Sequence, residues 1–149
     1  MTNTVNEIKL SYQPNRDYIE RYKIQNSQDA YTLVASLFDD DLIYLREEMV
    51  VVYLNRGNRV LGYCKAFSGG NSGVLVDIKM ILAVALKGMA TSIILAHNHP
   101  SCNLKPSQQD RALTANLKEA CKPVDIYLAD HLIITPDGKY YSFADEGII

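Results

Sequence analysis

The spacing of hydrophobic residues along the chain predicts three helices. The first begins at Ser27, where a Ser-x-x-Ala sequence precedes apolar residues at helical spacing, and we expect the compact domain (residues 27–149) to begin there. Asp77–Lys87 predicts a second helix, because its apolar residues recur on one face. Ser107–Cys121 predicts a third, with Leu113 and Leu117 on one face.

Runs of β-branched and other apolar residues predict the strands. Met49–Asn55 and Arg59–Phe67 flank an Asn-Arg-Gly-Asn turn, which predicts a hairpin. Thr91–Ala96 predicts a short buried strand. Further strands are predicted towards the C-terminus at Val124–Leu128, Leu132–Thr135 and Lys139–Phe143. The order of these elements favours a mixed sheet flanked by helices, hence an α/β or α+β fold and not a doubly wound sheet.

Two segments fall outside this regular order. Residues 1–26 form an extension, in which Glu7–Tyr12 alternates and predicts an edge strand that Pro14 ends. Ser68–Gly73 holds three glycines and predicts a loop.

Composition restricts the class of protein. A length of 149 residues with 48% hydrophobic and 21% charged residues is typical of one globular domain. The formal net charge of -2 provides no overall basic field of the kind that sequence-independent DNA binding uses. Weak binding to nucleic acid is therefore expected.

The cysteines and the apolar runs indicate the compartment. Cys64, Cys102 and Cys121 are too scattered for a disulfide framework and form no Cys-x-x-Cys pair, which suggests a reducing environment. The N-terminus lacks the features of a secretory signal, and the longest apolar stretches, near Ile81–Leu86 and Ile93–Ala96, are too short to span a membrane. We expect a cytoplasmic protein without membrane association.

The segment from His97 to Asp110, HNHPSCNLKPSQQD, carries the candidate chemistry. Side chains alternate along a strand, so His97 and His99 project to the same side where the buried strand ends before Pro100. Asp110 lies in the first turn of the following helix. Two imidazoles and a carboxylate are a common ligand set for catalytic zinc, with a fourth position left for water. A general base is also needed, and Glu47 or Glu48, just before a strand, can supply one.

Each piece also has a simpler interpretation. Ser107 with Asp110 three residues later is typical of a capping box, and that interpretation is the stronger one for this tetrapeptide alone. The two roles can coexist, since a helix N-terminus keeps a carboxylate ionised. An isolated His-x-His can be two satisfied polar side chains at the end of a strand. The sequence Arg46-Glu47-Glu48 is ordinarily a solvated turn.

The same segment resembles the signature of the JAMM (MPN-type) metalloproteases, and more closely their bacterial RadC-like branch. Residues 27–149 share the resemblance, which extends to Arg46-Glu47, to Asn55–Leu61, to the Asp-His-Leu-Ile segment 130–133 and to the tail at 141–147. It implies a JAMM/MPN domain of cytidine-deaminase-like architecture. It also implies that His97, His99 and Asp110 bind one zinc ion. Glu47 would activate the metal-bound water, and Ser107 would hydrogen-bond the oxyanion.

The chain departs from the RadC-like pattern in three places. Cys102 stands where that branch usually has glycine, and we interpret it as occupying the loop rather than binding metal, since cysteine favours burial. Residues 77–80 replace a common Pro-Arg pair, and residues 1–26 are too short for a helix-hairpin-helix region. His131 is not at a recognised ligand spacing, so a structural or supporting role is favoured over a fourth ligand.

The leading hypothesis is a zinc-dependent hydrolase of amide bonds, a metallopeptidase or isopeptidase, with a peptide or protein substrate. The alternatives are a RadC-like accessory protein associated with DNA repair and a non-catalytic MPN scaffold. An HNH nuclease is disfavoured because its three motif residues are not contiguous, and a zinc deaminase would need His-x-Glu and Pro-Cys-x-x-Cys, which are absent. A homo-oligomer is compatible with the sequence.

Overall fold

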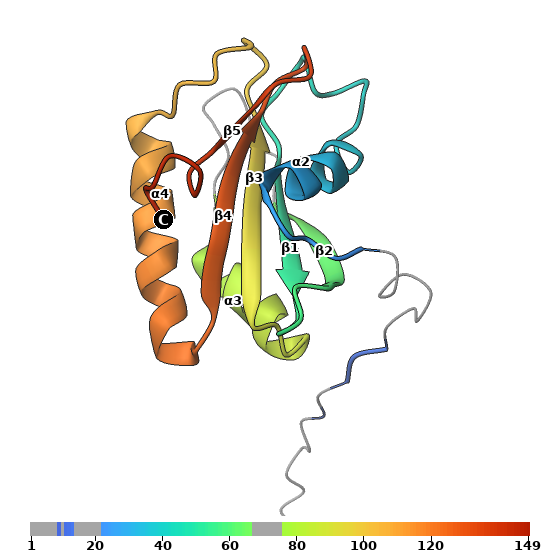
Figure 1. The fold of residues 1–149 in the computed structure, drawn as a ribbon, viewed down its shortest axis with the longest axis vertical. Coiled ribbons are helices and arrows are strands. Elements are labelled where there is room, and N and C mark those ends of the chain that lie inside the picture. The colour runs from blue at the N-terminus through green and yellow to red at the C-terminus, as the bar shows by residue number, and fades with distance from the viewer. Residues whose placement is uncertain (1–8, 10, 14–21, 67–75) are drawn as a thin grey trace, which may run out of the picture.

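A five-stranded mixed sheet lies at the centre of the fold, in the order β2-β1-β3-β4-β5 (Figure 1). The computed structural model describes residues 9, 11–13, 22–66 and 76–149. Strand β1 is antiparallel to both β2 and β3, β3 is parallel to β4, and β5 is antiparallel to β4. The strands are β1 Met49–Leu54, β2 Val60–Ala66, β3 Ser92–Asn98, β4 Tyr127–Ile134 and β5 Tyr140–Ser142. The predicted mixed sheet and the β1–β2 hairpin are confirmed.

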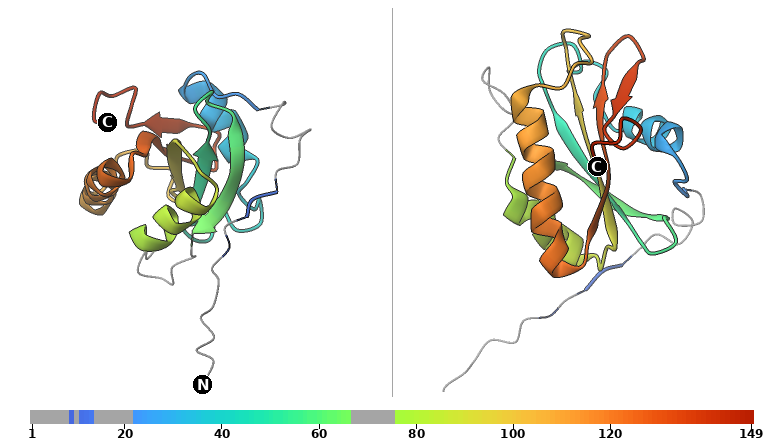
Figure 2. Two further views of the ribbon diagram at one scale, coloured as in Figure 1. Left: turned by 90° about the horizontal axis from the view of Figure 1, so that it is seen from below. Right: turned by 60° about the vertical axis from the view of Figure 1, so that its left-hand side comes forward.

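Helices cover both faces of the sheet, as the view from below in Figure 2 shows. Helix α2 (Ser27–Ala35) lies on one face, and α3 (Ile78–Lys87) and α4 (Gln108–Cys121) lie on the other. The side chains of Asn26, Asp77 and Ser107 cap these helices by accepting a hydrogen bond from a backbone N–H of the first turn. The three predicted helices are thereby confirmed, to within one residue at their N-termini.

Strand alternation divides the core into two clusters. All six residues of β1 are buried, because the strand is paired on both sides and covered on both faces. Its even-numbered residues pack on the side of α2, together with Leu33 and Val34. Its odd-numbered residues pack on the side of α3 and α4, together with Ile81 and Leu117. This two-sided burial is the reason that the strand reads as a continuous apolar run.

The prediction of two separate strands at Val124–Leu128 and Leu132–Thr135 is wrong. Residues 127–134 form the single strand β4, and Val124 lies in a 3₁₀ helix, η1 (Lys122–Val124). The polar residues Asp130 and His131 lie between the two predicted ranges. In the structure both side chains are buried and hydrogen-bonded, so the strand continues through them.

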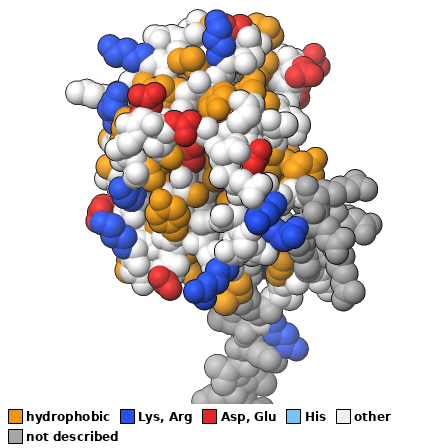
Figure 3. Space-filling view, in the orientation of Figure 1, with side chains coloured by type: hydrophobic (Ala, Val, Ile, Leu, Met, Phe, Trp, Pro, Cys, Tyr) orange, Lys and Arg blue, Asp and Glu red, His pale blue; other side chains and the backbone are white. Residues whose placement is uncertain are grey.

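Other predictions fall partly or wholly on residues outside those described. The loop at 68–73 is one. For the expected edge strand Glu7–Tyr12, the described residues Lys9, Ser11 and Tyr12 form no strand, although the Tyr12 hydroxyl donates to the carbonyl of Leu61. Among the described helices, none is long and apolar enough to cross a membrane. On the face shown in Figure 3, Lys and Arg side chains alternate with Asp and Glu without forming a continuous basic patch.

Asp130 connects the sheet to the C-terminal turn. Its Oδ1 accepts from the backbone N–H of His131 (2.7 Å) and of Ala144 (3.0 Å), and its Oδ2 accepts from the Ser142 hydroxyl (2.6 Å). The side chain is 5% exposed, and burial raises the pKa of this carboxyl. Removing it takes the acceptor from three donors, two of which belong to the buried residues His131 and Ser142.

We therefore expect Asp130→Ala to lower the free energy of unfolding by about 2–4 kcal/mol, measured by urea denaturation. Asp40→Ala is the control, because Asp40 is exposed, and it should change stability by no more than about 0.5 kcal/mol. Equal effects of the two substitutions would show that the Asp130 hydrogen bonds contribute nothing net.

Candidate metal centre

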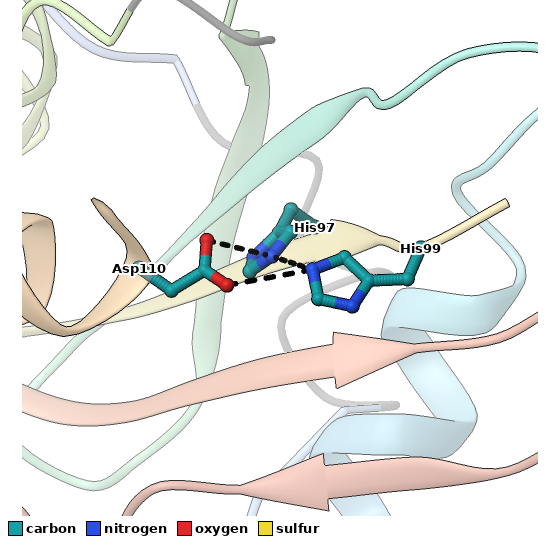
Figure 4. Close-up of side chains that lie close together, drawn as sticks. All are labelled: His97, His99 and Asp110. Carbon is teal, nitrogen blue, oxygen red and sulfur yellow. Dashed lines mark hydrogen bonds and ion pairs between the residues drawn. The ribbon is translucent and has the colours of Figure 1, made fainter. Parts of the chain in front are cut away.

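Two histidines meet at the end of β3. His97 is the penultimate residue of the strand, and His99 follows its last residue. The backbone N–H of His99 donates to the carbonyl of Ile134 (2.9 Å), so the pairing with β4 extends to His99 before Pro100 interrupts it. Because alternate residues share a face, both imidazole rings lie on the α4 side of the sheet. Figure 4 shows the rings turned towards each other and towards Asp110.

Asp110 reaches the histidines from the first turn of α4. Ser107 is the N-cap: its Oγ accepts from the N–H of Asp110 (3.1 Å), and Asp110 Oδ2 accepts from the N–H of Ser107 (2.7 Å). The predicted capping box is therefore present in full. The cap also orients the carboxylate, so capping and proximity to the histidines coexist in one residue.

In the described part of the chain, His97, His99 and Asp110 form a group that could hold a metal ion. Their ligand atoms all lie within 4.8 Å of one another. The Nε2 atoms of His97 and His99 lie 2.9 Å apart. Asp110 oxygens lie 3.2 Å from the His97 Nε2 and 3.4 Å from the His99 Nε2. A tetrahedral zinc site with bonds of about 2.0–2.1 Å needs ligand atoms about 3.3 Å apart, so both the donor types and the spacing fit zinc.

The charges in this cluster are strongly coupled. Burial alone would raise the pKa of Asp110, but hydrogen bonds with His97 and His99 outweigh it and hold that pKa far below its usual range. Burial would lower the pKa of His99, yet the hydrogen bonds with Asp110 and with the Asn103 carbonyl, and the negative charges of Asp110 and Glu47, raise it overall. Asp110 is thus an anion at neutral pH, and the cluster attracts positive charge.

His131 contacts a candidate ligand from the neighbouring strand. Its Nε2 lies 2.8 Å from the Nδ1 of His97, and its Nδ1 lies 2.7 Å from the hydroxyl of Thr114 on α4. The ring has no exposed surface and stacks on Phe143 with centroids 4.7 Å apart. Burial holds the pKa of His131 well below its ordinary value. The ring supports His97 and is not a member of the three-residue group.

The register of β1 against β3 separates the two candidate bases. Met49 pairs with His97, and the N–H of Asn98 donates to the carbonyl of Glu48 (3.3 Å), so the register continues and places Glu47 opposite His99. Opposite residues of an antiparallel pair share a face, hence Glu47 is on the same face as the histidines and Glu48 on the other. The buried carboxylate of Glu48 accepts instead from Arg46 (3.0 Å).

Asn98 holds the segment that carries Glu47 against β3. Its Oδ1 accepts from the N–H of Glu48 (2.6 Å), and its Nδ2 donates to the carbonyls of Ile43 (2.8 Å) and Arg46 (2.9 Å). The side chain is fully buried on the α2 side of the sheet. Sequence reasoning missed this role and that of Thr114. A polar residue between two same-facing histidines is the signal for Asn98, since it must find partners on the opposite face.

Cys102 lies in the loop that joins the ligands. Its side chain is exposed, contrary to the burial expected of a cysteine, and it is not part of the three-residue group. Its φ of 61° places the backbone in the left-handed region, where glycine is unstrained. This conformation gives a physical reason for the glycine that the RadC-like pattern usually has at this point.

Comparison with known proteins identifies the family of the chain. The RadC-like JAB domain model matches residues 24–148. A UPF0758 protein of Flavobacterium johnsoniae is 40% identical over 132 residues, which cover 89% of this chain and 56% of the relative. UPF0758 proteins of Porphyromonas gingivalis and Aquifex aeolicus are 38% and 37% identical over 91% and 87% of this chain, and over 59% and 54% of their own lengths. The resemblance drawn from the sequence is confirmed, and the chain spans a little over half the length of these relatives.

We expect Cys102→Gly to leave zinc content unchanged and to raise the free energy of unfolding by up to about 1 kcal/mol, because it relieves the left-handed strain without removing a candidate ligand. Elemental analysis and denaturation of the two proteins measure both effects. A large loss of bound metal in the glycine variant would make the thiol a ligand and the three-residue assignment wrong.

Proposed function

Because the chain belongs to the family of RadC-like JAB domains and brings two imidazoles and a carboxylate together, we propose that it is a zinc-dependent hydrolase of amide bonds. The observation that carries the proposal is the convergence of His97, His99 and Asp110 at the end of β3. Two neutral imidazoles and one carboxylate leave a fourth position of a tetrahedral site open, which is the arrangement of catalytic rather than structural zinc.

The hydrogen bond behind His99 supports this role. Its Nδ1 lies 2.6 Å from the backbone carbonyl of Asn103, and a carbonyl can only accept. The ring therefore donates from Nδ1, and Nε2 is the nitrogen that faces Asp110 and His97. Histidine ligands of metals usually donate their other ring nitrogen in this way, and the bond fixes both the tautomer and the orientation of the ring.

Zinc held by these side chains would act as a Lewis acid that activates a water molecule and polarises a carbonyl. The placement of Glu47 opposite His99 supports it as the general base that takes a proton from the attacking water. The same carboxyl, once protonated, would pass the proton to the leaving amine. The substrate class that this chemistry suits is a peptide or an isopeptide bond.

Ser107 is proposed to stabilise the oxyanion. Its oxygen accepts the capping hydrogen bond from Asp110, and this leaves the hydroxyl proton available to donate. The residue is exposed at the N-terminus of α4, where the partial positive charge of the helix favours developing negative charge. Capping and oxyanion binding would use different parts of the same hydroxyl group.

Glu47→Gln tests the proposed base. We expect the variant to keep its fold and its zinc, because Glu47 lies outside the ligand group, and to lose about 10²–10⁴-fold of the rate of peptide hydrolysis. His97→Ala should lose the metal as well, since two protein ligands hold zinc poorly. Zinc is measured by elemental analysis of protein purified without an affinity tag, and turnover with a peptide library.

Glu48→Gln is the matched control, being the adjacent carboxylate on the opposite face of the sheet. It should remain active. An inactive Glu48→Gln beside an active Glu47→Gln would show that the assignment of the base is off by one residue. Full activity of both variants would place the base elsewhere, and absence of zinc from the wild-type protein would remove the proposal.

Duplex DNA should bind weakly to this chain. The net charge is -2, and on the face shown in Figure 3 the charges of both signs are interspersed. We expect a Kd in or above the non-specific range of roughly 10⁻⁴–10⁻⁶ M in a fluorescence titration at physiological salt. Nanomolar binding would instead favour the role of a DNA-associated accessory protein.

A further inference from the structure

We propose that Thr114 and His131 are positioning residues that make Nδ1 of His97 a hydrogen-bond donor, so that Nε2, which faces His99 and Asp110, is the nitrogen that can give up its proton and bind a metal. The inference rests on the proposed metal site for its purpose, whereas the tautomer itself is a property of the metal-free protein. Three hydrogen bonds, each with a defined direction, carry it.

Thr114 determines which atom donates in each of these hydrogen bonds. Its hydroxyl lies 2.7 Å from the backbone carbonyl of Asp110, one helical turn earlier, and a carbonyl can only accept. The single hydroxyl proton of Thr114 is therefore used in that bond. The same oxygen lies 2.7 Å from the Nδ1 of His131, so here it can only accept, and His131 must donate from Nδ1.

Because His131 donates from Nδ1, the donor in its hydrogen bond with His97 is determined as well. A neutral imidazole carries one N–H, so a ring that donates from Nδ1 presents a lone pair at Nε2. His131 has no exposed surface, and full burial favours the neutral ring. Its Nε2 lies 2.8 Å from the Nδ1 of His97, which must then donate. A proton of His97 is thus held on Nδ1, and Nε2 is the nitrogen that faces Asp110 and His99.

The Nδ1 atoms of the two candidate histidine ligands have different hydrogen-bond partners. Behind His99 stands a backbone carbonyl, that of Asn103, whose direction cannot reverse. Behind His97 stands another imidazole, which can accept or donate. Without Thr114, His131 could carry its proton on Nε2 and donate to His97, and His97 would then hold its proton on Nε2, the atom that lies 2.9 Å from His99. The Thr114 hydroxyl prevents this arrangement, because it can only accept a hydrogen bond from Nδ1 of His131.

The surroundings hold His131 in place for this function. Its ring stacks on Phe143 at an interplanar angle of 11°, and its carbonyl accepts from the N–H of Phe143 (3.0 Å). Its own N–H donates to Asp130. The Asp-His-Leu-Ile segment and the Ser-Phe-Ala tail, which are distant from the ligands in sequence, therefore meet at the ring that orients His97.

The first test reads the tautomer directly, in metal-free protein, from the ¹⁵N chemical shifts of the histidine rings. We expect His97 to be protonated at Nδ1 in the wild-type protein and in Thr114→Ser, which keeps the hydroxyl. In Thr114→Val, which removes it with little change of shape, the His97 proton should move towards Nε2. Thr135→Val is the control, because Thr135 is also buried and its hydroxyl is hydrogen-bonded away from the histidines, with the Asp137 carboxylate (2.5 Å) and the Lys139 carbonyl (3.1 Å) as acceptors within reach.

The second test measures Zn²⁺ affinity by competition with a chromogenic chelator, beside thermal unfolding of the metal-free proteins. Thr114→Val should bind Zn²⁺ about 10–100-fold more weakly, and Thr114→Ser should restore the affinity. Thr135→Val should lose stability without losing affinity. His131→Leu, which removes the acceptor behind His97, should reproduce the shift of Thr114→Val and serves if that variant does not fold.

The two measurements separate the failures. A Thr114→Val or His131→Leu protein that keeps the wild-type His97 tautomer overturns the inference. A wild-type protein that does not bind Zn²⁺ overturns the proposed function. In that case the ¹⁵N chemical shifts of the histidine rings still test the inference about His97 by themselves. Equal losses of affinity in Thr114→Val and Thr135→Val would reduce Thr114 to a packing residue and also overturn the inference.

Discussion

The central position of β3 is the constraint on which the rest of the site depends. The strand is paired with β1 on one side and β4 on the other, and all seven of its residues are buried. A strand held on both edges cannot rotate, so its side chains alternate strictly between the two faces. His97 and His99 are thereby directed at the start of α4, and Asn98 is directed at the loop before β1. One strand end thus aims the candidate ligands and anchors the candidate base.

Placing polar groups in such a core is stable only when each is paired, because an unpaired buried donor or acceptor costs about 1–3 kcal/mol. Around the histidines and Asp130, the chain meets this condition with directed hydrogen bonds. His99 donates to a carbonyl, His97 donates to His131, and Asp130 accepts from three donors. The Nε2 atoms of the two histidines and the anionic carboxylate of Asp110 come together at one point, and no hydrogen bond from the surrounding protein fixes a proton there. Such a point suits a cation, and the family relationship makes zinc hydrolysis its natural use.

Local sequence determined the elements and the donor set. Periodicity predicted α2, α3 and α4, because each is amphipathic and capped by its own neighbouring residue. Turn residues predicted the β1–β2 hairpin. The His-x-His spacing at the end of an apolar strand, with Asp110 after a capping serine, was sufficient to single out the three residues that the fold brings together. These are short-range properties, which a single sequence carries in full.

Long-range packing decided the rest. Two strands were predicted on either side of Asp130 and His131, and the partners that these side chains find on β5, on α4 and in the tail allow β4 to continue through them. Thr114 carries no local signal, because its role depends on a histidine 17 residues away. Similarly, the family resemblance favours Glu47 over Glu48, but only the register of β1 against β3 puts the two carboxylates on opposite faces of the sheet. Hydrogen-bond direction and strand register are properties of contacts, so the folded structure alone determines them.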